Sequence, residues 1–450
     1  MKKVLALVAA STLLATSAMA DEPVMSSYNF SIGGYVKLDY AYNSDNLGVA
    51  GTITPGGAGL GSALAAKTGP SQQEQSILGV KQSRLWFKAN GPTFLGAKTG
   101  ALIEGDFYGD NSSAAESPQF RLRHAYGTID WANTSILFGQ YWDMFAPFVA
   151  STQDFRCGAT TGAPNNPRSP QIKLTQRINL DQDNQLQFVV GLTDPTQYND
   201  NGGVYTGTAA TTGVVTGTAP LTAPTNAYGA SLNYAAQLFF VSKAMGVAPG
   251  YFGMANQPFK IGIFGEYGNE HLHAAGTTAA DTWGYGAYLF APILKSSDGK
   301  SRAMTMSLEG QVYEAANMAF NAATAAQFAN GATNVSATAA TNLEPRRDLG
   351  VAAQIIFYPI QQLGLTAGYG NRINVNKAAD MSQTAVYQKY NQELYFNAAY
   401  DLNAAVRVAA EYQNLEASFK NTDPTSGEFV AGAKAIASVN IARVCLYYFF

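Results

Sequence analysis

Apolar and polar side chains alternate along many short stretches of this chain, and the clearest is the last, residues 435–450. One set of alternate positions there is wholly apolar and becomes aromatic toward the end: Ala442, Val444, Leu446, Tyr448 and Phe450. Successive side chains of a β-strand point to opposite faces, so this pattern predicts a strand with one apolar face. A strand of a soluble sandwich could alternate in the same way, but it rarely ends a chain on an aromatic residue. Transmembrane barrels place girdles of aromatic residues at the membrane interface.

Sixteen segments of this kind can be recognised, each bounded by turn residues. They are residues 30–42, 82–90, 94–107, 120–131, 135–144, 171–180, 185–192, 228–240, 259–267, 283–289, 302–313, 348–358, 363–372, 391–400, 405–413 and 435–450. Along the chain the connections between these segments are alternately long and short. The one exception is residues 242–257, which stand where a short turn is expected but form a longer connection. Up-and-down membrane barrels alternate long outer loops with short periplasmic turns. The sequence therefore predicts an all-β fold, a 16-stranded antiparallel transmembrane up-and-down β-barrel with both termini on the periplasmic side.

The beginning of the chain has the features of a secretory signal peptide. Two lysines are followed by an apolar stretch and by Ala-Met-Ala at residues 18–20, which has the form of a cleavage site. The apolar stretch is much shorter than the roughly 20 residues that a membrane-spanning helix needs. We therefore predict a signal peptide over residues 1–20 and a barrel over residues 21–450 that is exported to the bacterial cell outer membrane.

The composition agrees with a membrane barrel. The chain has 25 tyrosines and 24 phenylalanines but only 13% charged residues, which is unusual for a soluble exported enzyme. In a barrel the lipid face and the lumen face alternate, so the overall hydropathy averages near zero. Two cysteines in 450 residues exclude a disulfide scaffold, and no catalytic, phosphate-binding or metal-binding motif stands out. We therefore expect no cofactor, no metal and no nucleic acid as a partner.

Sixteen strands enclose a lumen that side chains cannot fill, so it holds water and its charges influence which solutes pass. On the first six strands the alternation places these basic residues inward: Lys37, Arg84, Lys88, Lys98, Arg121, Arg123, Lys173 and Arg177. The acidic residues placed inward there are Asp39, Glu104 and Asp106. Later strands contribute a more acidic mixture: Glu266, Glu309, Glu393, Glu411, Lys260, Arg407 and Arg443. Such a basic wall would favour anions; alternatively, these charges only pair with one another.

Several features of the chain resemble known porins. Sixteen strands, a long third loop and a terminal Phe are similar to the general Gram-negative porins. Four runs are more specifically similar to the DcaP-like trimeric porins: Q-S-R-L-W-F-K-A-N-G-P (82–92), E-G-D-F-Y-G (104–109), R-L-R-H-A-Y (121–126) and G-Q-Y-W-D-M-F (139–145). Beyond Pro170 only the general porin pattern continues. The resemblance implies a homotrimer that passes small hydrophilic, often anionic, solutes. The family's N-terminal coiled coil has no counterpart in residues 21–28, so the barrel walls alone would hold the trimer together.

The resemblance also implies that the third loop, residues 145–170, folds into the barrel and narrows it. In that case these charged residues of the loop and its flanks can face the basic wall: Asp143, Asp154, Arg156 and Arg168. Cys157 lies in the same loop, and the alternation points Cys445 inward on the last strand. In an oxidising compartment these two thiols could form a disulfide that fixes the loop. Two separate buried thiols are the alternative.

Two functions other than passive diffusion remain open from the sequence. An outer-membrane barrel enzyme, a lipase or protease, would need a catalytic base at the rim, and His271 or His273 would be its only candidate. The barrel could also be the sheath of an electron-transfer conduit whose cytochrome is a separate chain. The wide barrel and the charged lumen favour a porin that is not an enzyme and that lets small hydrophilic solutes and ions diffuse across outer-membrane lipid.

Overall fold

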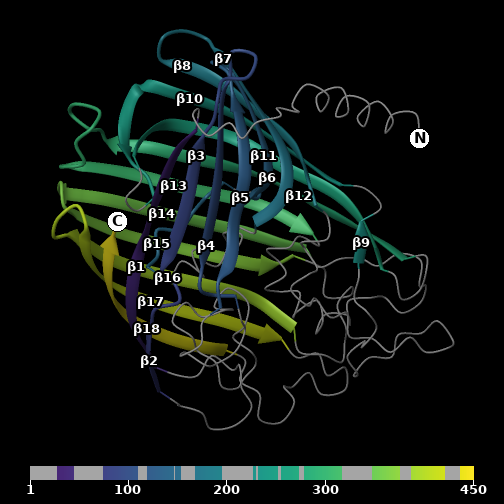
Figure 1. Ribbon diagram of the computed structural model, residues 1–450. Helices are drawn as coiled ribbons and strands as arrows, with labels where there is room; N and C mark the ends of the chain where they lie inside the picture. The colour runs from purple at the N-terminus through teal and green to yellow at the C-terminus, as the bar shows by residue number, and fades with distance from the viewer. Residues whose placement is uncertain are drawn as a thin grey trace.

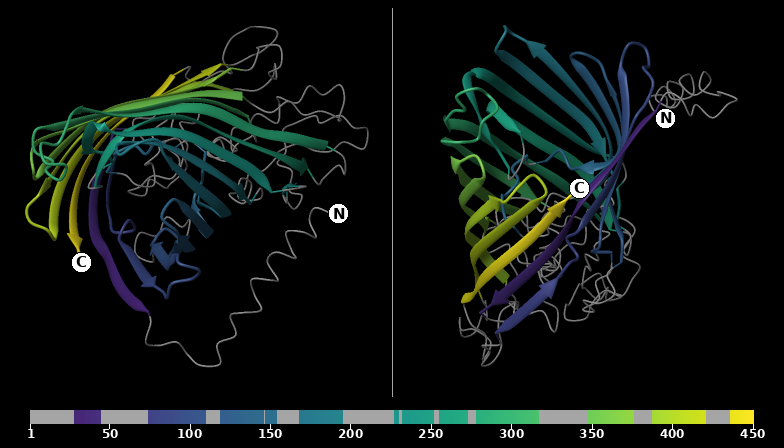
Figure 2. Two further views of the ribbon diagram at one scale, coloured as in Figure 1. Left: turned by 90° about the horizontal axis from the view of Figure 1, so that it is seen from above. Right: turned by 60° about the vertical axis from the view of Figure 1, so that its left-hand side comes forward.

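The computed structural model of this chain is a closed antiparallel β-barrel (Figure 1). The structure describes residues 28–44, 74–109, 119–145, 147–153, 168–194, 227–229, 232–251, 255–272, 278–316, 347–375, 387–420 and 436–450. The signal peptide predicted over residues 1–20 lies outside these ranges. In Figure 2 the first strand, in purple, and the last strand, in yellow, lie side by side and close the barrel.

The described part of the chain forms eighteen strand segments. They are β1 (Asn29–Asn43), β2 (Gln75–Gly79), β3 (Arg84–Asn90), β4 (Lys98–Asp106), β5 (Arg121–Asp130), β6 (Thr134–Trp142), β7 (Arg168–Asn179), β8 (Asn184–Thr193), β9 (Ala227–Gly229), β10 (Asn233–Pro249), β11 (Asn256–Leu272), β12 (Thr278–Leu294), β13 (Thr305–Ala316), β14 (Arg347–Ile360), β15 (Leu363–Asn374), β16 (Tyr387–Asp401), β17 (Val406–Lys420) and β18 (Ile436–Phe449). Both β2 and β3 pair with β1, and both β9 and β10 pair with β11, so each of these couples is one interrupted barrel strand. The barrel therefore has sixteen strands, which confirms the predicted fold.

The seam of the barrel joins β1 to β18. Tyr35 pairs with Phe449, and the antiparallel register continues for nine residue pairs. The last residue, Phe450, exchanges both backbone hydrogen bonds with Gly34, at 3.1 and 3.2 Å. The prediction that residues 435–450 form the closing strand is therefore confirmed.

One predicted connection is largely strand. Residues 242–257 were expected to link two strands, but β10 continues to Pro249 and β11 begins at Asn256. The pairing register shifts between Ser242 and Val247, so the strand contains extra residues at this point. Extra residues interrupt the period of two on which the prediction depended.

The outer face of the barrel is apolar. At the seam, exposed hydrophobic residues occupy every second position and pair across the two strands: Val36 with Tyr448, Leu38 with Leu446 and Tyr40 with Val444. The residues between them, Lys37, Asp39, Arg443 and Cys445, are buried inside the barrel. An apolar band around a barrel is stable in lipid, so this surface fits the outer membrane. No helix in the described residues is long and apolar enough to cross a membrane.

The short turns gather at one end of the barrel, the periplasmic end in the predicted orientation. In one of them Asp181 accepts hydrogen bonds from two backbone N–H groups and from the Asn184 amide. In another, Asp298 accepts from the backbone N–H groups of Lys300 and Ser301, at 2.8 and 2.6 Å. These donors stabilise the ionised carboxylates and lower their pKa values, chiefly through the Asn184 side chain at Asp181 and the Ser301 N–H at Asp298.

Candidate functional site

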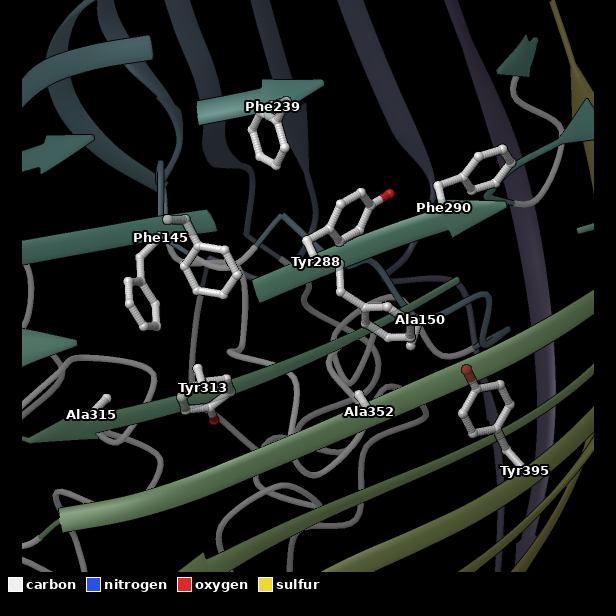
Figure 3. Close-up of a cluster of buried hydrophobic side chains, with 11 residues drawn as sticks. Phe145, Ala150, Phe239, Tyr288, Phe290, Tyr313, Ala315, Ala352 and Tyr395 are labelled. Carbon is white, nitrogen blue, oxygen red and sulfur yellow. The ribbon is translucent and has the colours of Figure 1, made fainter. Parts of the chain in front are cut away.

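Part of the long connection between β6 and β7 runs through the interior of the barrel. Phe145, Phe148 and Ala150 are buried against inward-facing side chains of the strands (Figure 3). The strand residues of this cluster are Phe239, Phe264, Tyr288, Phe290, Tyr313, Ala315, Ala352 and Tyr395. The Phe145 ring meets those of Phe264 and Tyr313 edge-on, with centroids 5.0 and 5.6 Å apart. This part of the predicted third loop therefore lies inside the barrel. We call residues 143–145 and 147–153 the loop 3 segment.

Polar side chains of the barrel wall bind the backbone of the loop 3 segment. The Phe148 N–H donates to Gln311 Oε1 at 3.1 Å, and the Ser151 N–H donates to Gln354 Oε1 at 2.8 Å. The Asn397 amide donates to the Ser151 carbonyl at 2.5 Å. A buried segment without regular secondary structure must have its backbone groups satisfied by other partners. Amide side chains on β13, β14 and β16 supply those partners here.

The loop 3 segment ends on the seam of the barrel. The carbonyl of Gln153 accepts a hydrogen bond from Lys37 Nζ of β1 at 2.6 Å. Its side-chain oxygen accepts from the Tyr447 hydroxyl of β18 at 2.9 Å, and its N–H donates to Glu411 Oε2 of β17 at 2.6 Å. A single residue of the loop is therefore bonded to three neighbouring strands where the barrel closes.

Inward-facing glutamates lie on the wall that the loop 3 segment covers. They are Glu266, Glu309, Glu393 and Glu411, and each is at most 5% exposed. Each accepts hydrogen bonds from hydroxyl, amide or backbone N–H groups around it. Their carboxylates therefore have partners in the protein and present little surface to the lumen.

An ion-pair cluster lies on the opposite wall, on β3, β4 and β5. Arg121 and Arg123 lie 2.7 and 2.8 Å from Asp106, and Arg123 is also 2.7 Å from Glu104. Arg84 is 3.6 Å from Glu104. In contrast to the glutamates of the other wall, the Arg121 side chain is 29% exposed and the Arg84 side chain 15% exposed. Arg121 is therefore the most accessible charged side chain of this cluster, and Glu104, at 13%, is about as exposed as Arg84.

Arg168, the first residue of β7, adds a fourth guanidinium. Its guanidinium carbon lies 5.2 Å from the centre of the Trp142 ring, and that of Arg123 lies 5.4 Å from the same ring. The positive charges of Arg123, Arg121 and Arg84 and the negative charge of Asp106 act on Arg168, and no ion pair joins Arg168 to a carboxylate of the described residues. We call this group the arginine cluster; its charged members are Arg84, Arg121, Arg123, Arg168, Glu104 and Asp106. It holds two more positive than negative charges.

A bulge in β5 shapes this cluster. Glu104 pairs with His124 while Gly105 pairs with Leu122, so Arg123 is an extra residue between them. Arg123 and His124 are neighbours in sequence, yet both are buried inside the barrel. Strict alternation would place only one of them there. A bulge leaves no clear signal in the sequence, so the inward position of His124 is known only from the structure.

A second buried charged group lies at the seam, where the sequence placed Lys37, Asp39 and Arg443. Lys37 Nζ lies 2.8 Å from Asp39, and Arg443 lies 3.8 Å from both Asp39 and Glu411. All of them face inward, but they are almost fully buried because the loop 3 segment covers them. This part of the predicted lining therefore holds the loop in place and has little contact with the lumen.

The remaining predicted basic residues are separate from the arginine cluster. Lys88 and Lys98 are exposed near the short-turn ends of β3 and β4. Lys173 lies over the Tyr141 ring at 4.5 Å, and Arg177 donates to Ser135 Oγ at 3.1 Å. Arg407 is paired with Asp401 at 2.5 Å, and Lys260 lies over the Phe239 ring at 3.9 Å. The structure thus brings together only part of the basic wall that the sequence predicted.

The loop and its cysteines are described in part. Asp143 accepts hydrogen bonds from the Phe145 N–H at 2.8 Å and from Ser169 Oγ at 3.2 Å. Cys445 is a free buried thiol that donates to Asp39 Oδ1 at 2.9 Å. The structure therefore does not contain the disulfide considered for it. Its suggested partner Cys157 lies outside the described residues, as do Asp154, Arg156 and His273 and the side chain of His271. Among the described residues, no group of three or more His, Cys, Asp and Glu could hold a metal ion.

Solved structures of outer-membrane channels are similar to this chain over nearly its whole length. The outer membrane channel DcaP of Acinetobacter baumannii matches 95% of this chain and 99% of that chain, with a TM-score of 0.61 and 16% sequence identity. The anion-selective porin from Comamonas acidovorans matches 94% of this chain and 100% of that chain, with a TM-score of 0.50 and 11% identity. No family model and no curated protein matches the sequence. The chain has the fold of the 16-stranded porins of the bacterial outer membrane.

Proposed function

We propose that this chain is an outer-membrane porin through which small hydrophilic solutes and ions diffuse passively, with a preference for anions. The observation that carries the proposal is the unequal burial of opposite charges inside the barrel. The arginine cluster has an excess of positive charge and is partly exposed, whereas the glutamates of the opposite wall are each at most 5% exposed and bonded to protein groups. One of them, Glu411, accepts a hydrogen bond from the loop 3 segment.

The size of this effect follows from the charges of the arginine cluster. Its four guanidinium groups exceed its two carboxylates, so an anion beside the cluster meets a net positive charge. A unit charge at about 4 Å contributes about 1 kcal/mol even in water, and more where the walls exclude water. Because 1.4 kcal/mol corresponds to a factor of ten, the two excess charges together, at about 2 kcal/mol, are expected to enrich anions beside the cluster roughly thirtyfold.

A constriction makes such a charge effective. In a wide pore a solute can pass far from the wall, where salt screens the field within about 10 Å at 0.1 M. The loop 3 segment occupies part of the lumen and contacts β13, β14, β16 and the seam strands. The solute is therefore confined to the remaining space, which the arginine cluster borders.

The experiment is a planar-bilayer recording of the refolded protein across a gradient of KCl. We expect stepwise conductance and a reversal potential of the sign that indicates anion selectivity. A cation-selective reversal potential would refute the preference for anions while keeping the channel. No conductance from a correctly folded barrel would refute the channel itself.

We also propose that the porin is a homotrimer embedded in outer-membrane lipid. The support is the resemblance to trimeric porins in the first third of the sequence together with the porin fold of the chain. Cross-linking in detergent should give a species of three chains, and conductance should rise in groups of three steps. A single-chain mass in detergent with single conductance steps would contradict the trimer.

A further inference from the structure

The outer face of the barrel carries aromatic and charged side chains at the end away from the short turns. Tyr285 of β12 pairs there with Glu314 of β13. In the next row, Ala316 of β13 pairs with Trp283 of β12 and with Arg347 of β14. The outward-facing residues of the three rows nearer the short turns are all apolar: Ala287, Val312 and Val351; Leu289, Gly310 and Ala353; Ala291, Leu308 and Ile355. We call Trp283, Tyr285, Glu314 and Arg347 the outer-face cluster, and it lies where the apolar face ends.

The side chains of the outer-face cluster contact one another. Glu314 accepts a hydrogen bond from the Tyr285 hydroxyl at 2.8 Å and one from Arg347 Nε at 3.0 Å. The Trp283 and Tyr285 rings are stacked, with centroids 5.8 Å apart and planes 11° from parallel. The guanidinium carbon of Arg347 lies 5.6 Å from the centre of the Trp283 ring. These contacts hold two aromatic rings, a cation and a carboxylate in one arrangement on the surface.

The position of the cluster matches the boundary between lipid hydrocarbon and lipid headgroups. Charged residues on the lipid face of a barrel are costly at the membrane centre but cost little near its surfaces. Tyr and Trp are enriched at those surfaces. The same edge continues on the next strands, where the Tyr369 hydroxyl donates to Gln392 at 3.0 Å and the Tyr390 hydroxyl to Glu416 at 2.7 Å. The molecules beside the outer-face cluster are therefore lipid headgroups.

The exposed groups of the cluster suit a phosphorylated sugar. The Arg347 side chain is 45% exposed, and a guanidinium binds phosphate oxygens through parallel N–H groups. The Tyr285 side chain is 57% exposed, and the C–H groups of a sugar ring pack well against an aromatic face. Glu314 is 20% exposed, and its carboxylate can accept a hydrogen bond from a hydroxyl or amide N–H of the sugar.

We propose that the outer-face cluster binds the phosphorylated glucosamine headgroup of lipopolysaccharide, the glycolipid of the outer leaflet. Arg347 binds a phosphate, the stacked rings of Trp283 and Tyr285 support the sugar ring, and Glu314 holds Arg347 in place. In the predicted orientation the long connections face the outside of the cell, so this end of the strands meets the outer leaflet. The inference goes beyond the proposed function, because it concerns the lipid surface of the barrel and not its lumen.

The test is native mass spectrometry of the refolded full chain in detergent, titrated with diphosphoryl lipid A. We expect saturable binding to the unmodified protein. Arg347→Gln should weaken it about tenfold, because a charge-assisted contact with phosphate is lost. Arg347→Lys keeps the charge without the planar fork and should weaken it about threefold. Trp283→Ala should weaken it as well, because one of the two stacked rings is lost.

Two matched controls change an exposed tyrosine and an exposed lysine near the short-turn end of the barrel. They are Tyr400→Ala and Lys243→Gln, and both should bind lipid A as the unmodified protein does. Equal binding by the unmodified protein and by Arg347→Gln would refute the site.

Other occupants of this face give different results. If phosphatidylglycerol binds as tightly as lipid A and depends equally on Arg347, the cluster recognises phosphate alone and the recognition of the sugar is refuted. If Arg347→Gln and Trp283→Ala separate associated copies of the chain and leave lipid A binding unchanged, the face is a contact between copies and the proposal is overturned. None of these results depends on conductance, so the bilayer recording tests the proposed function separately.

Discussion

Replacing Arg168 by Gln tests the electrostatic role of the arginine cluster most directly. Arg168 forms no ion pair with a described carboxylate and lies among the charges of Arg121, Arg123 and Arg84, so its loss leaves no buried carboxylate without a partner. The change halves the net positive charge of the cluster. A unit charge at about 4 Å contributes about 1 kcal/mol in water. We therefore expect the permeability ratio of chloride to potassium to fall about fivefold.

The assay is the reversal potential across a tenfold KCl gradient. It is measured twice, once with two dilute KCl solutions and once with two concentrated ones. The Debye length is about 10 Å at 0.1 M and about 3 Å at 1 M, so the effect should be large at low salt and small at high salt. Arg347→Gln is the matched control, because Arg347 is an exposed arginine on the outer side of β14, paired with Glu314. Unchanged selectivity in Arg168→Gln, or a change equal to that of the control, would refute the reasoning.

Three further predictions concern stability and access. Arg123→Ala removes one partner each from Glu104 and Asp106, at 2.7 and 2.8 Å, while Arg84 and Arg121 remain beside them. It should lower the free energy of unfolding by about 1.5–3 kcal/mol, and a urea titration in detergent that shows no loss would contradict the buried pairing. Gln153→Ala should lower it by about 1–3 kcal/mol and add noise to the single-channel current, and a quiet, fully stable variant would argue against the seam contact. Cys445 is buried and should react with a water-soluble maleimide only after unfolding, as mass spectrometry can follow; rapid labelling of the folded barrel would contradict its position.

The strand count could be predicted because it depends on local pattern. Each strand has a lipid face that must be apolar, so a period of two recurs whatever the rest of the chain does. Long and short connections then alternate for a geometric reason, since an up-and-down barrel has two different ends. Errors occurred where a strand departs from ideal pairing, as between Ser242 and Val247.

The candidate site was predictable only in part. Alternation placed Arg84, Arg121 and Glu104 correctly on the inner face, but the bulge at Arg123 also turned His124 inward. The alternation shows which charged side chains face inward, but it does not show which of them a loop will cover. The glutamates of the later strands are buried among hydroxyl and amide groups of the wall, and Glu411 is also bonded to the loop 3 segment. No periodicity within those strands indicates these contacts.

The sequence by itself determined the class of fold, the number of strands and the closing role of the C-terminal residues. These follow from the requirement that every lipid-facing position be apolar and every backbone group be paired in a closed sheet. Only the tertiary structure decided the chemistry of the lumen. The path of the loop 3 segment to Gln153 depends on contacts between residues far apart in the chain. Such contacts decide which charges remain accessible, because a charge influences a solute only where protein groups do not already surround it.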